Sequence, residues 1–354
     1  MNIPYRTRRV LNRLGVVLLV LLLVGIIAWL CWVIWLERYI VYTDDGASLD
    51  FSISAQDLVG EVAVPPVAEG NVSIYYNEGA DALDTTNALT QLNGYYIDIS
   101  MLQNNIGDVW EDIEILPAGT PVLIDLKGGY GSFFYSSKLG DAIHSQAVSV
   151  AAVDELIKEL QKRGFYTIAR ISAFRDYNFG LNHVSSGLMH VNRLGLWPDE
   201  GNCYWMDPSN STTVSWVTSI ILELKELGFH EVVLTDFRFP DSDQYIFNGN
   251  KDETLIAVMN TLLTSCGSDD FVLSFSVDRP DFPLPEGRSR LYLEGVDPQN
   301  VAATAAKVVI VDPEARLVFV ANTNDTRFNE YGVLRSLEVA ESLEAQKADE
   351  AENE

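Results

Sequence analysis

The chain has 354 residues, of which 47% are hydrophobic and three are cysteines, so it is neither a disordered chain nor a disulfide-rich scaffold. Its 50 acidic residues outnumber the 24 basic ones and give a net charge of −26, which argues against nucleic acid as a partner. The sequence leaves open whether Cys203 and Cys266 pair. Cysteines and histidines form no cluster with metal-ligand spacing, so we predict no metal and no other cofactor.

The first 35 residues predict a membrane anchor. Residues 14–34 contain no charged side chain, and a run of this length suits a helix that crosses a bilayer. Arginines precede the run and acidic residues follow it, so we expect a cytoplasmic tail (1–13), a transmembrane helix (14–35) and an extracellular remainder. A cleaved signal peptide is the alternative, but the run is too long and no small-residue cleavage site follows it.

The extracellular part divides by composition into three segments. Residues 36–93 are acidic with scattered Gly, Pro and Asn, which is typical of a stalk. Residues 336–354 are rich in Glu and Ala and predict a disordered acidic tail. Between them, residues 94–335 contain apolar, β-rich runs that alternate with helical patterns, which predicts the folded domain.

The folded domain is expected to contain eight strands and four helices. The predicted strands are Tyr95–Met101, Val122–Leu126, Thr167–Phe174, Glu231–Thr235, Phe271–Val277, Arg290–Leu293, Lys307–Val311 and Leu317–Ala321. The predicted helices are Val153–Arg163, Thr212–Leu227, Thr254–Leu263 and Pro298–Ala306. Strands that alternate with helices form a parallel sheet, and eight of them predict an α/β fold, a (β/α)8 barrel of the TIM type. Several connections are too short for regular helices, so we expect the barrel to be irregular.

Polar residues gather where the predicted strands end. The second strand ends at Asp125 and Lys127, and the fourth runs into Asp236 and Arg238. Residues two apart on a strand share a face, so the members of each pair are expected to point the same way. Enzymes built on this barrel place their reactive groups at the carboxyl ends of the strands.

Four segments carry a resemblance to a known family: PVLIDLKGGYG (121–131), KRGFYTIARISAFRDY (162–177), GLWPDEGNCYWMDPSN (195–210) and LGFHEVVLTDFRFP (227–240). In this order and spacing they resemble the bacterial "putative glycoside hydrolase" TIM-barrel domain, a family of largely unestablished activity. The family motifs fall on Asp125 and Lys127, Ala169 and Arg170, Arg175 and Asp176, Trp205 with Asp207 and Pro208, and Arg238 with Phe239 and Pro240.

Two departures from the family pattern bear on catalysis. Gly128 and Gly129 stand where the family usually has further acidic residues. The family's fourth-strand Asp aligns with Thr235, and Asp236 takes the position of a Tyr. One residue along a strand reverses the side chain's face. Either a local bulge returns Asp236 to the rim, or the acid has been lost.

Glycosidic cleavage needs two carboxyl groups, and the predicted pair is Asp236 with Asp125, while Asp278 and Glu294 are held in reserve. Two structural alternatives stay open: Arg170 and Asp236 as an ion pair between strands, and Asp207 as a turn or helix cap. Side chains expected to bind substrate are Lys127, Arg170, Asp176, Asp207, Arg238, Tyr130, Trp197 and Tyr204.

The resemblance and the predicted anchor together imply a membrane-anchored glycoside hydrolase that acts on a cell-wall or extracellular polysaccharide. The acidic charge favours a neutral or cationic polymer, for example a de-N-acetylated amino-sugar polymer. The alternative is a non-catalytic barrel that binds a glycan or a partner at the cell surface, which Thr235, Gly128 and Gly129 favour. Two carboxyl groups in one open cleft would support the enzyme, whereas an Asp236 turned into the helix layer would remove it from the site.

Overall fold

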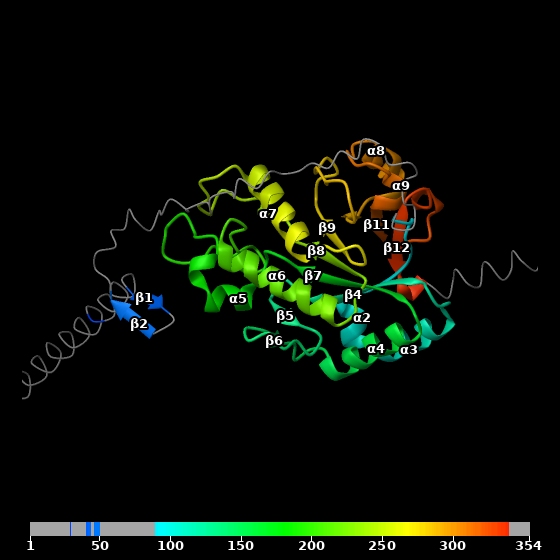
Figure 1. Ribbon diagram of the computed structural model, residues 1–354, viewed down its shortest axis with the longest axis horizontal. Helices are drawn as coiled ribbons and strands as arrows, with labels where there is room; N and C mark the ends of the chain where they lie inside the picture. Colours follow the sequence, from blue (N-terminus) through cyan, green and yellow to red (C-terminus); the bar gives the residue numbers. More distant parts are fainter. Residues whose placement is uncertain (1–28, 30–39, 44–45, 50–88, 340–354) are drawn as a thin grey trace, which may run out of the picture. The chain divides into compact units, whose positions relative to one another are not determined.

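The computed structural model describes residue 29 and residues 40–43, 46–49 and 89–339 (Figure 1). The chain divides into two compact units, Met1–Asp81 and Ala82–Glu354. In the first unit, β1 (Ile40–Thr43) pairs with β2 (Gly46–Leu49) as an antiparallel hairpin.

The predicted membrane segment is not among the residues that the structure describes. The tail 1–13 and the helix 14–35, apart from Trp29, lie outside them, as do most of the stalk and most of the acidic tail. Within the described ranges, no helix has both the length and the apolar character needed to cross a membrane.

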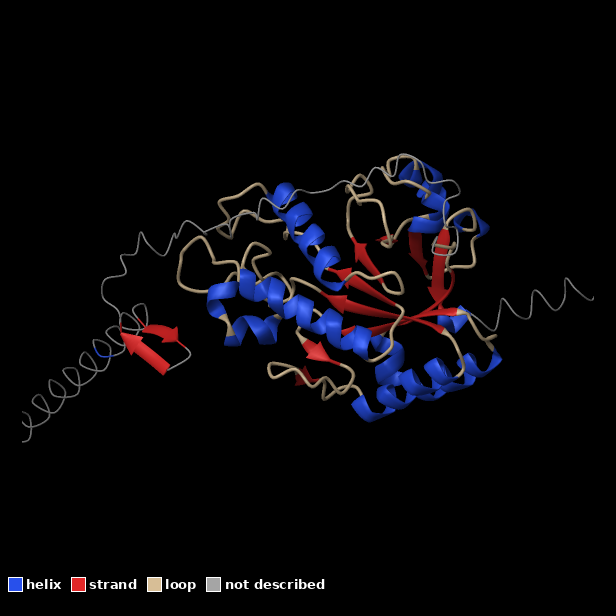
Figure 2. Ribbon diagram, in the orientation of Figure 1, coloured by secondary structure: helices blue, strands red, loops and turns tan. Residues whose placement is uncertain are grey.

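The second unit contains a closed barrel of eight parallel strands, which confirms the predicted fold (Figures 1 and 2). Around the barrel each strand pairs with the next in chain order, and the last pairs with the first. The strands are β3 (Asn93–Ile97), β4 (Pro121–Lys127), β7 (Tyr166–Ser172), β8 (Glu231–Thr235), β9 (Val272–Ser276), β10 (Leu291–Glu294), β11 (Leu317–Ala321) and β12 (Gly332–Ser336). Two-residue strands β5 (Ser132–Phe133) and β6 (Ile143–His144) extend the sheet beside β4.

One predicted strand is wrong and one real strand was missed. Residues Lys307–Val311 form an irregular loop, in which Val308 and Ile310 pack on the core while Val309 and Val311 are exposed. The loop is apolar and alternating, as a strand would be, but β11 already pairs with β10 and β12, so no sheet edge is left for it. The eighth strand is instead β12.

Helices cover the outside of the barrel (Figure 2). The three long predicted helices are confirmed as α4 (Val150–Lys162), α6 (Ser211–Glu226) and α7 (Lys251–Cys266). The Asn210 side chain starts α6 by accepting a bond from the Thr212 N–H, and Gly228, at φ +90°, follows its end. The predicted helix Pro298–Ala306 divides into η3 (Pro298–Asn300) and α8 (Val301–Ala305).

The remaining elements are short and connect the strands. Asp98 ends the first strand earlier than predicted, because its side chain caps α2 by accepting a bond from the Met101 N–H. The other short helices are α2 (Ile99–Asn104), α3 (Ile106–Ile115), α5 (Tyr177–Asn182), α9 (Pro313–Arg316), η2 (Val184–Ser186), η4 (Thr326–Phe328) and η5 (Leu337–Val339).

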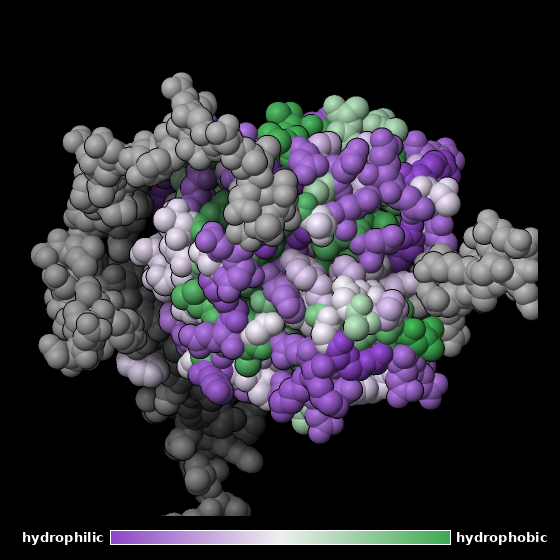
Figure 3. All heavy atoms as spheres, turned by 45° about the vertical axis from the view of Figure 1, so that its right-hand side comes forward, coloured by the Kyte–Doolittle hydropathy of each residue, from purple (hydrophilic) through white to green (hydrophobic). Residues whose placement is uncertain are grey.

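Strand alternation gives the barrel two separate cores. Outward-facing residues such as Ile124, Ile171 and Phe275 pack against the helices in the larger core. The middle of the barrel interior is filled by Leu92, Leu123, Ile168, Val233, Tyr292, Val318 and Leu334. The face shown in Figure 3 is mainly hydrophilic with scattered apolar patches. Inward-facing positions above and below the interior layer are polar, and these positions define the candidate site.

Candidate functional site

The lower polar layer, at the amino ends of the strands, is closed. Glu231 and Arg290 form an ion pair of 2.6 Å, and their side chains are 0% and 2% exposed. Ser274 Oγ and Tyr292 OH donate to Glu231 Oε1 at 2.6 and 2.9 Å, and Tyr166 OH donates to Oε2 at 3.0 Å. Burial and the Glu231 carboxylate raise the pKa of Tyr166. Both carboxylate oxygens are satisfied without solvent, so this layer is structural.

The upper polar layer, at the carboxyl ends, is built on Arg170. Its Nε and Nη2 donate to the two carboxylate oxygens of Asp125 at 2.5 and 2.9 Å, and Nη1 donates to Glu294 Oε2 at 3.3 Å. The Ile99 N–H donates to Asp125 Oδ2 at 3.0 Å, and Ser276 Oγ donates to Glu294 Oε1 at 2.9 Å. Burial alone would lower the pKa of the guanidinium, but Asp125 and Glu294 raise it above its ordinary value.

This upper layer opens into a cleft of ≈ 520 Å³ at the carboxyl ends of β3, β7, β10 and β11. Its polar lining consists of Tyr96, Asp98, Arg170, Glu294, Asp297, Asn322 and Thr323. Glu294 is 39% exposed, whereas Asp125, behind Arg170, is 15% exposed. The cleft lies where barrel enzymes bind their substrates, and Glu294 is an accessible carboxylate in it that Arg170 and Ser276 orient.

Asp236 remains at the mouth of the barrel. The strand β8 ends at Thr235, and Asp236 adopts a left-handed backbone with φ of 52°. Its Oδ2 accepts a bond of 2.7 Å from Ser172 Oγ at the carboxyl end of β7. The side chain of Asp236 is therefore not turned into the helix layer. Its direction is set by the left-handed backbone of Asp236 and not by a bulge. It is not among the residues that line the cleft beside Glu294, and Arg170 pairs with Asp125 and Glu294, not with Asp236.

The expectation that Asp125 and Lys127 share a face is wrong. The register between β4 and β7 shifts between these two residues, so Lys127 leaves the barrel interior. Its Nζ lies 2.9 Å from Asp176 Oδ2, and the two side chains are 0% and 1% exposed. Asp176 also accepts from the Phe179 N–H at 2.8 Å and caps α5. No substrate can reach either group in this conformation, so the predicted substrate contacts are replaced by a buried ion pair.

A further ion pair, between Arg175 and Asp199, was not predicted from the sequence. Arg175 Nε donates to Asp199 Oδ2 at 2.5 Å, and a side chain at Gly129 or Gly201 would come within 2.6 Å of this guanidinium. Burial alone would raise the pKa of the Asp199 carboxyl, but bonds from Arg175 and the Cys203 N–H lower it to about 2. The glycine in place of an acidic residue at 129, noted in the sequence, was the available signal.

The predicted aromatic platform is present in part. Tyr130 is exposed, and its OH donates to the Gly201 carbonyl oxygen at 2.7 Å. Tyr204 stacks on Tyr177 with ring centroids 5.1 Å apart and planes inclined by 8°. Trp197 is instead buried and packs against Tyr245, so it offers no free ring face.

Two further predicted binding residues have structural partners. Asp207 accepts bonds from the N–H and the Oγ of Ser209, which makes it a turn residue, as the structural alternative held. The Arg238 guanidinium lies 5.1 Å from the Trp205 ring centroid and 3.7 Å from Asp278 Oδ2. Asp236 and Arg238 therefore point to different partners.

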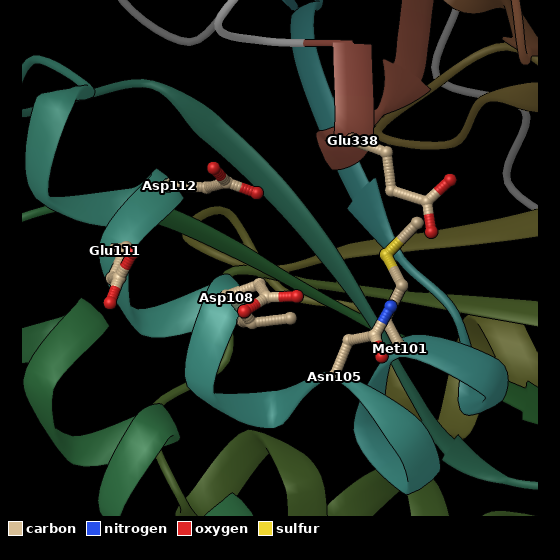
Figure 4. A pocket seen from close by; sticks show the side chains of 7 residues that line it. Met101, Asn105, Asp108, Glu111, Asp112 and Glu338 are labelled. Carbon is tan, nitrogen blue, oxygen red and sulfur yellow. The ribbon is translucent and has the colours of Figure 1, made fainter.

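A second hollow, of ≈ 270 Å³, shares no lining residue with the cleft (Figure 4). Asp108, Glu111 and Asp112 reach it from α3, and Glu338 reaches it from η5, which follows β12. Over residues 89–339 and the other described positions, no group of three or more His, Cys, Asp or Glu side chains is placed to hold a metal ion. Cys203 and Cys266 are free, and burial raises the pKa of each thiol to about 11.

The fold and the mouth together define a (β/α)8 barrel with an open, carboxylate-lined cleft at its carboxyl end. Residues 116–268 match the family described as "Putative glycosyl hydrolase domain", which confirms the resemblance seen in the sequence. Over these residues the chain is thus similar to a glycoside hydrolase-like domain.

Solved structures with similar folds were found at low identity. A hypothetical protein from Ruminiclostridium thermocellum is 20% identical, with a TM-score of 0.44 over 51% of this chain and 96% of its own. Aspergillus fumigatus Ega3, in complex with galactosamine, is 12% identical, with a TM-score of 0.45 over 73% and 96%. The PgaB (BpsB) glycoside hydrolase domain from Bordetella bronchiseptica is 10% identical, with a TM-score of 0.47 over 66% and 85%. A comparison with curated proteins found no match.

Proposed function

We propose that the protein is a membrane-anchored glycoside hydrolase that acts outside the cell on a cell-wall or extracellular polysaccharide. The observation that carries the proposal is the cleft at the barrel mouth, in which Glu294 is accessible and oriented by Arg170 and Ser276. The family match of residues 116–268 supports the reaction class. The charge-free run at 14–34, with arginines before it, supports the anchor and the extracellular side.

The geometry favours Asp236 with Glu294 as the reacting pair. They stand at the ends of β8 and β10, with only β9 between them. Neighbouring strands lie ~4.8 Å apart, so these strand ends are about 10 Å apart, a span that side chains can narrow to the separation glycosidases use. Asp125, the partner expected from the sequence, has both oxygens engaged by Arg170 and the Ile99 N–H. It is therefore a poor candidate for attack or proton transfer.

The two carboxyl groups have different surroundings and so different roles. Arg170 and Ser276 hold Glu294 by hydrogen bonds and orient it as the group that attacks the sugar or activates water. Asp236 accepts a single bond, from Ser172 Oγ, and its Oδ1 has no hydrogen-bond partner among residues 89–339. Asp236 is thus the group free to protonate the leaving oxygen.

The lining favours a neutral or cationic polysaccharide. Asp98, Glu294 and Asp297 face the cleft, and the guanidinium that lines it, on Arg170, is already engaged by Asp125. A polyanion would meet uncompensated repulsion there, and nucleic acid is disfavoured for the same reason. A polymer that carries free amino groups would be attracted. The Tyr130 ring and the stacked Tyr204 are candidates to hold sugar faces.

The second candidate function is a non-catalytic barrel that binds a glycan or a partner at the cell surface. Thr235 stands where the family has its acid, and its Oγ1 donates to the Ile171 carbonyl oxygen at 3.3 Å instead of reaching a substrate. Gly129 packs against Arg175 and supplies no acid. These losses favour binding without cleavage.

Glycan release by the full-length protein decides between them. Neutral and amino-sugar polysaccharides would be incubated with the wild type, Asp236→Asn, Glu294→Gln and Glu111→Gln. Glu111 is the matched control, since its exposed carboxylate lies in the separate hollow of α3. Release by the wild type and Glu111→Gln, with a loss of about 100-fold or more in the other two, is expected. Binding without release by any of the four proteins would support the non-catalytic barrel.

A further inference from the structure

We propose that Asp125 is a positioning residue that acts through Arg170 to set the protonation of Glu294. The inference rests on the proposed function in that Glu294 is taken as a reacting group. It gives Asp125 a role that differs from the catalytic one expected from the sequence. Asp125 touches no substrate in this scheme and works by sharing one guanidinium with the accessible carboxylate.

Arg170 is divided unequally between the two carboxylates. Two of its N–H groups reach Asp125, at 2.5 and 2.9 Å, while one reaches Glu294, at 3.3 Å. A guanidinium that donates two parallel N–H bonds to one carboxylate has a fixed plane, so the third contact is fixed in direction as well. The Ile99 N–H anchors Asp125 from the start of α2. Three elements, β4, β7 and α2, therefore determine where the positive charge stands relative to Glu294.

The sharing also limits how much positive charge Glu294 experiences. Asp125 binds the Nε and Nη2 groups of the guanidinium and offsets part of its field at Glu294. The Asp125 and Arg170 side chains are 15% and 14% exposed, so solvent screens the pair less than it would at the surface. The titratable and charged groups that face Glu294 from the surrounding elements are Tyr96 (β3), Asp98 (cap of α2), Asp125 (β4), Arg170 (β7), Asp236 (end of β8) and Asp297 (cap of η3). Arg170 is the only cation in that set, and Asp125 is the carboxylate bound to it through two N–H groups.

Replacing Asp125 and replacing Arg170 should shift the titration midpoint of Glu294 in opposite directions. Asp125→Asn leaves the full charge of Arg170 to Glu294, favours its anion and lowers the midpoint. Arg170→Gln removes the cation, leaves Glu294 among like charges and raises the midpoint. Each shift is expected to be roughly half to one pH unit, the size of a partly screened charge change at this range. A merely structural Asp125 would not produce this pair of opposite signs.

The test is a pH titration of the full-length chain with 13C at the side-chain carboxyl of glutamate, followed by NMR. The resonance that is missing in Glu294→Gln identifies the group. Asp108→Asn, on the exposed face of α3, is the control for removing a negative charge elsewhere and should leave the midpoint unchanged. Thermal unfolding establishes that each variant is folded. An unmoved midpoint in either folded variant, or shifts of the same sign, would overturn the proposal.

Arg170→Gln keeps the proposal testable if Asp125→Asn does not fold, because an unchanged midpoint in that variant alone would overturn it. The titration needs no substrate, so it is independent of glycan release. Opposite shifts in a protein that releases no glycan would support the coupling of Asp125 to Glu294 through Arg170. They would at the same time contradict the proposed hydrolase function. In an active enzyme, the acid limb of the pH–rate profile should move with the NMR midpoint in each variant.

Discussion

The two ends of the barrel interior carry the same chemistry in different surroundings. At the amino end, Arg290 pairs with Glu231, and hydroxyl groups occupy the remaining positions on the carboxylate. At the carboxyl end, Arg170 pairs with Asp125 but still extends one N–H to the exposed Glu294. Residue type alone does not separate a structural ion pair from a site. Burial and the completeness of the hydrogen bonding do.

The largest loss of stability is expected from a change at the amino end of the barrel. Glu231→Gln leaves Arg290 buried without its counter-charge, so the free energy of unfolding should fall by about 3–5 kcal/mol. Glu294→Gln is the matched change at the mouth, where the pair is longer and exposed, and it should cost less than about 1 kcal/mol. Denaturant unfolding of the full-length chain measures both. Equal losses would mean that the two layers do not differ as described.

A slightly smaller loss is expected beside the mouth. Asp176→Asn leaves Lys127 as an uncompensated buried cation and weakens the cap of α5, so we expect a loss of about 3 kcal/mol in unfolding free energy. The comparison variant is Asp207→Asn, which disturbs only a turn on Ser209 and should cost about 1 kcal/mol or less. If Asp176→Asn were as mild as Asp207→Asn, the ion pair would be open to solvent and available to a ligand.

The pair Arg175–Asp199 makes a third, pH-dependent contribution. The pKa of Asp199 is lowered to about 2 in the folded protein, so its stabilisation is fully present above about pH 4, the unfolded value. It is lost as the pH falls through about 2. Asp199→Asn should therefore be less stable than the wild type by about 1–2 kcal/mol at pH 7, and the difference should close near pH 2. A constant difference across that range would contradict the assignment.

The smallest effect on stability should come from Asp236 itself. A left-handed backbone suits glycine better than aspartate, so Asp236→Gly should change the unfolding free energy by less than about 1 kcal/mol while glycan release is lost. Asp312→Gly is the control, because Asp312 is also left-handed, at φ 54°, and lies on the loop before α9. It should leave release intact. A large loss of stability in Asp236→Gly would give Asp236 a structural role instead.

Sequence patterns predicted the elements whose local signals agree with their surroundings. The helix α6 has an Asn cap, an apolar stripe and a terminal glycine, and its bounds came out within one residue. The run Lys307–Val311 has strand-like residues but no neighbouring edge to pair with, and pairing is not encoded locally. The closing strand Gly332–Ser336 was missed because it is short and contains the charged Arg335.

The sequence predicted where the residues of the candidate site lie, but not which of them form ion pairs and hydrogen bonds. The strand ends correctly brought Asp125, Arg170 and Glu294 to one mouth. Which of them pair depends on a register shift within β4, which sends Lys127 away from Asp125 and carries no signature in the sequence. The turn of Asp236 toward Ser172 is likewise a backbone choice that only the folded chain reveals.

The closure of the barrel by β12 has a consequence for how the chain is made. The first strand of the barrel, β3, pairs on one side with β12, the last of the eight barrel strands in chain order. Until residues 332–336 emerge, β3 and β11 are open edges, which can pair with other chains and promote aggregation. The barrel therefore cannot close before residues 332–336 have been synthesised. Any factor that accompanies the nascent chain would have to shield those edges until the last strand arrives.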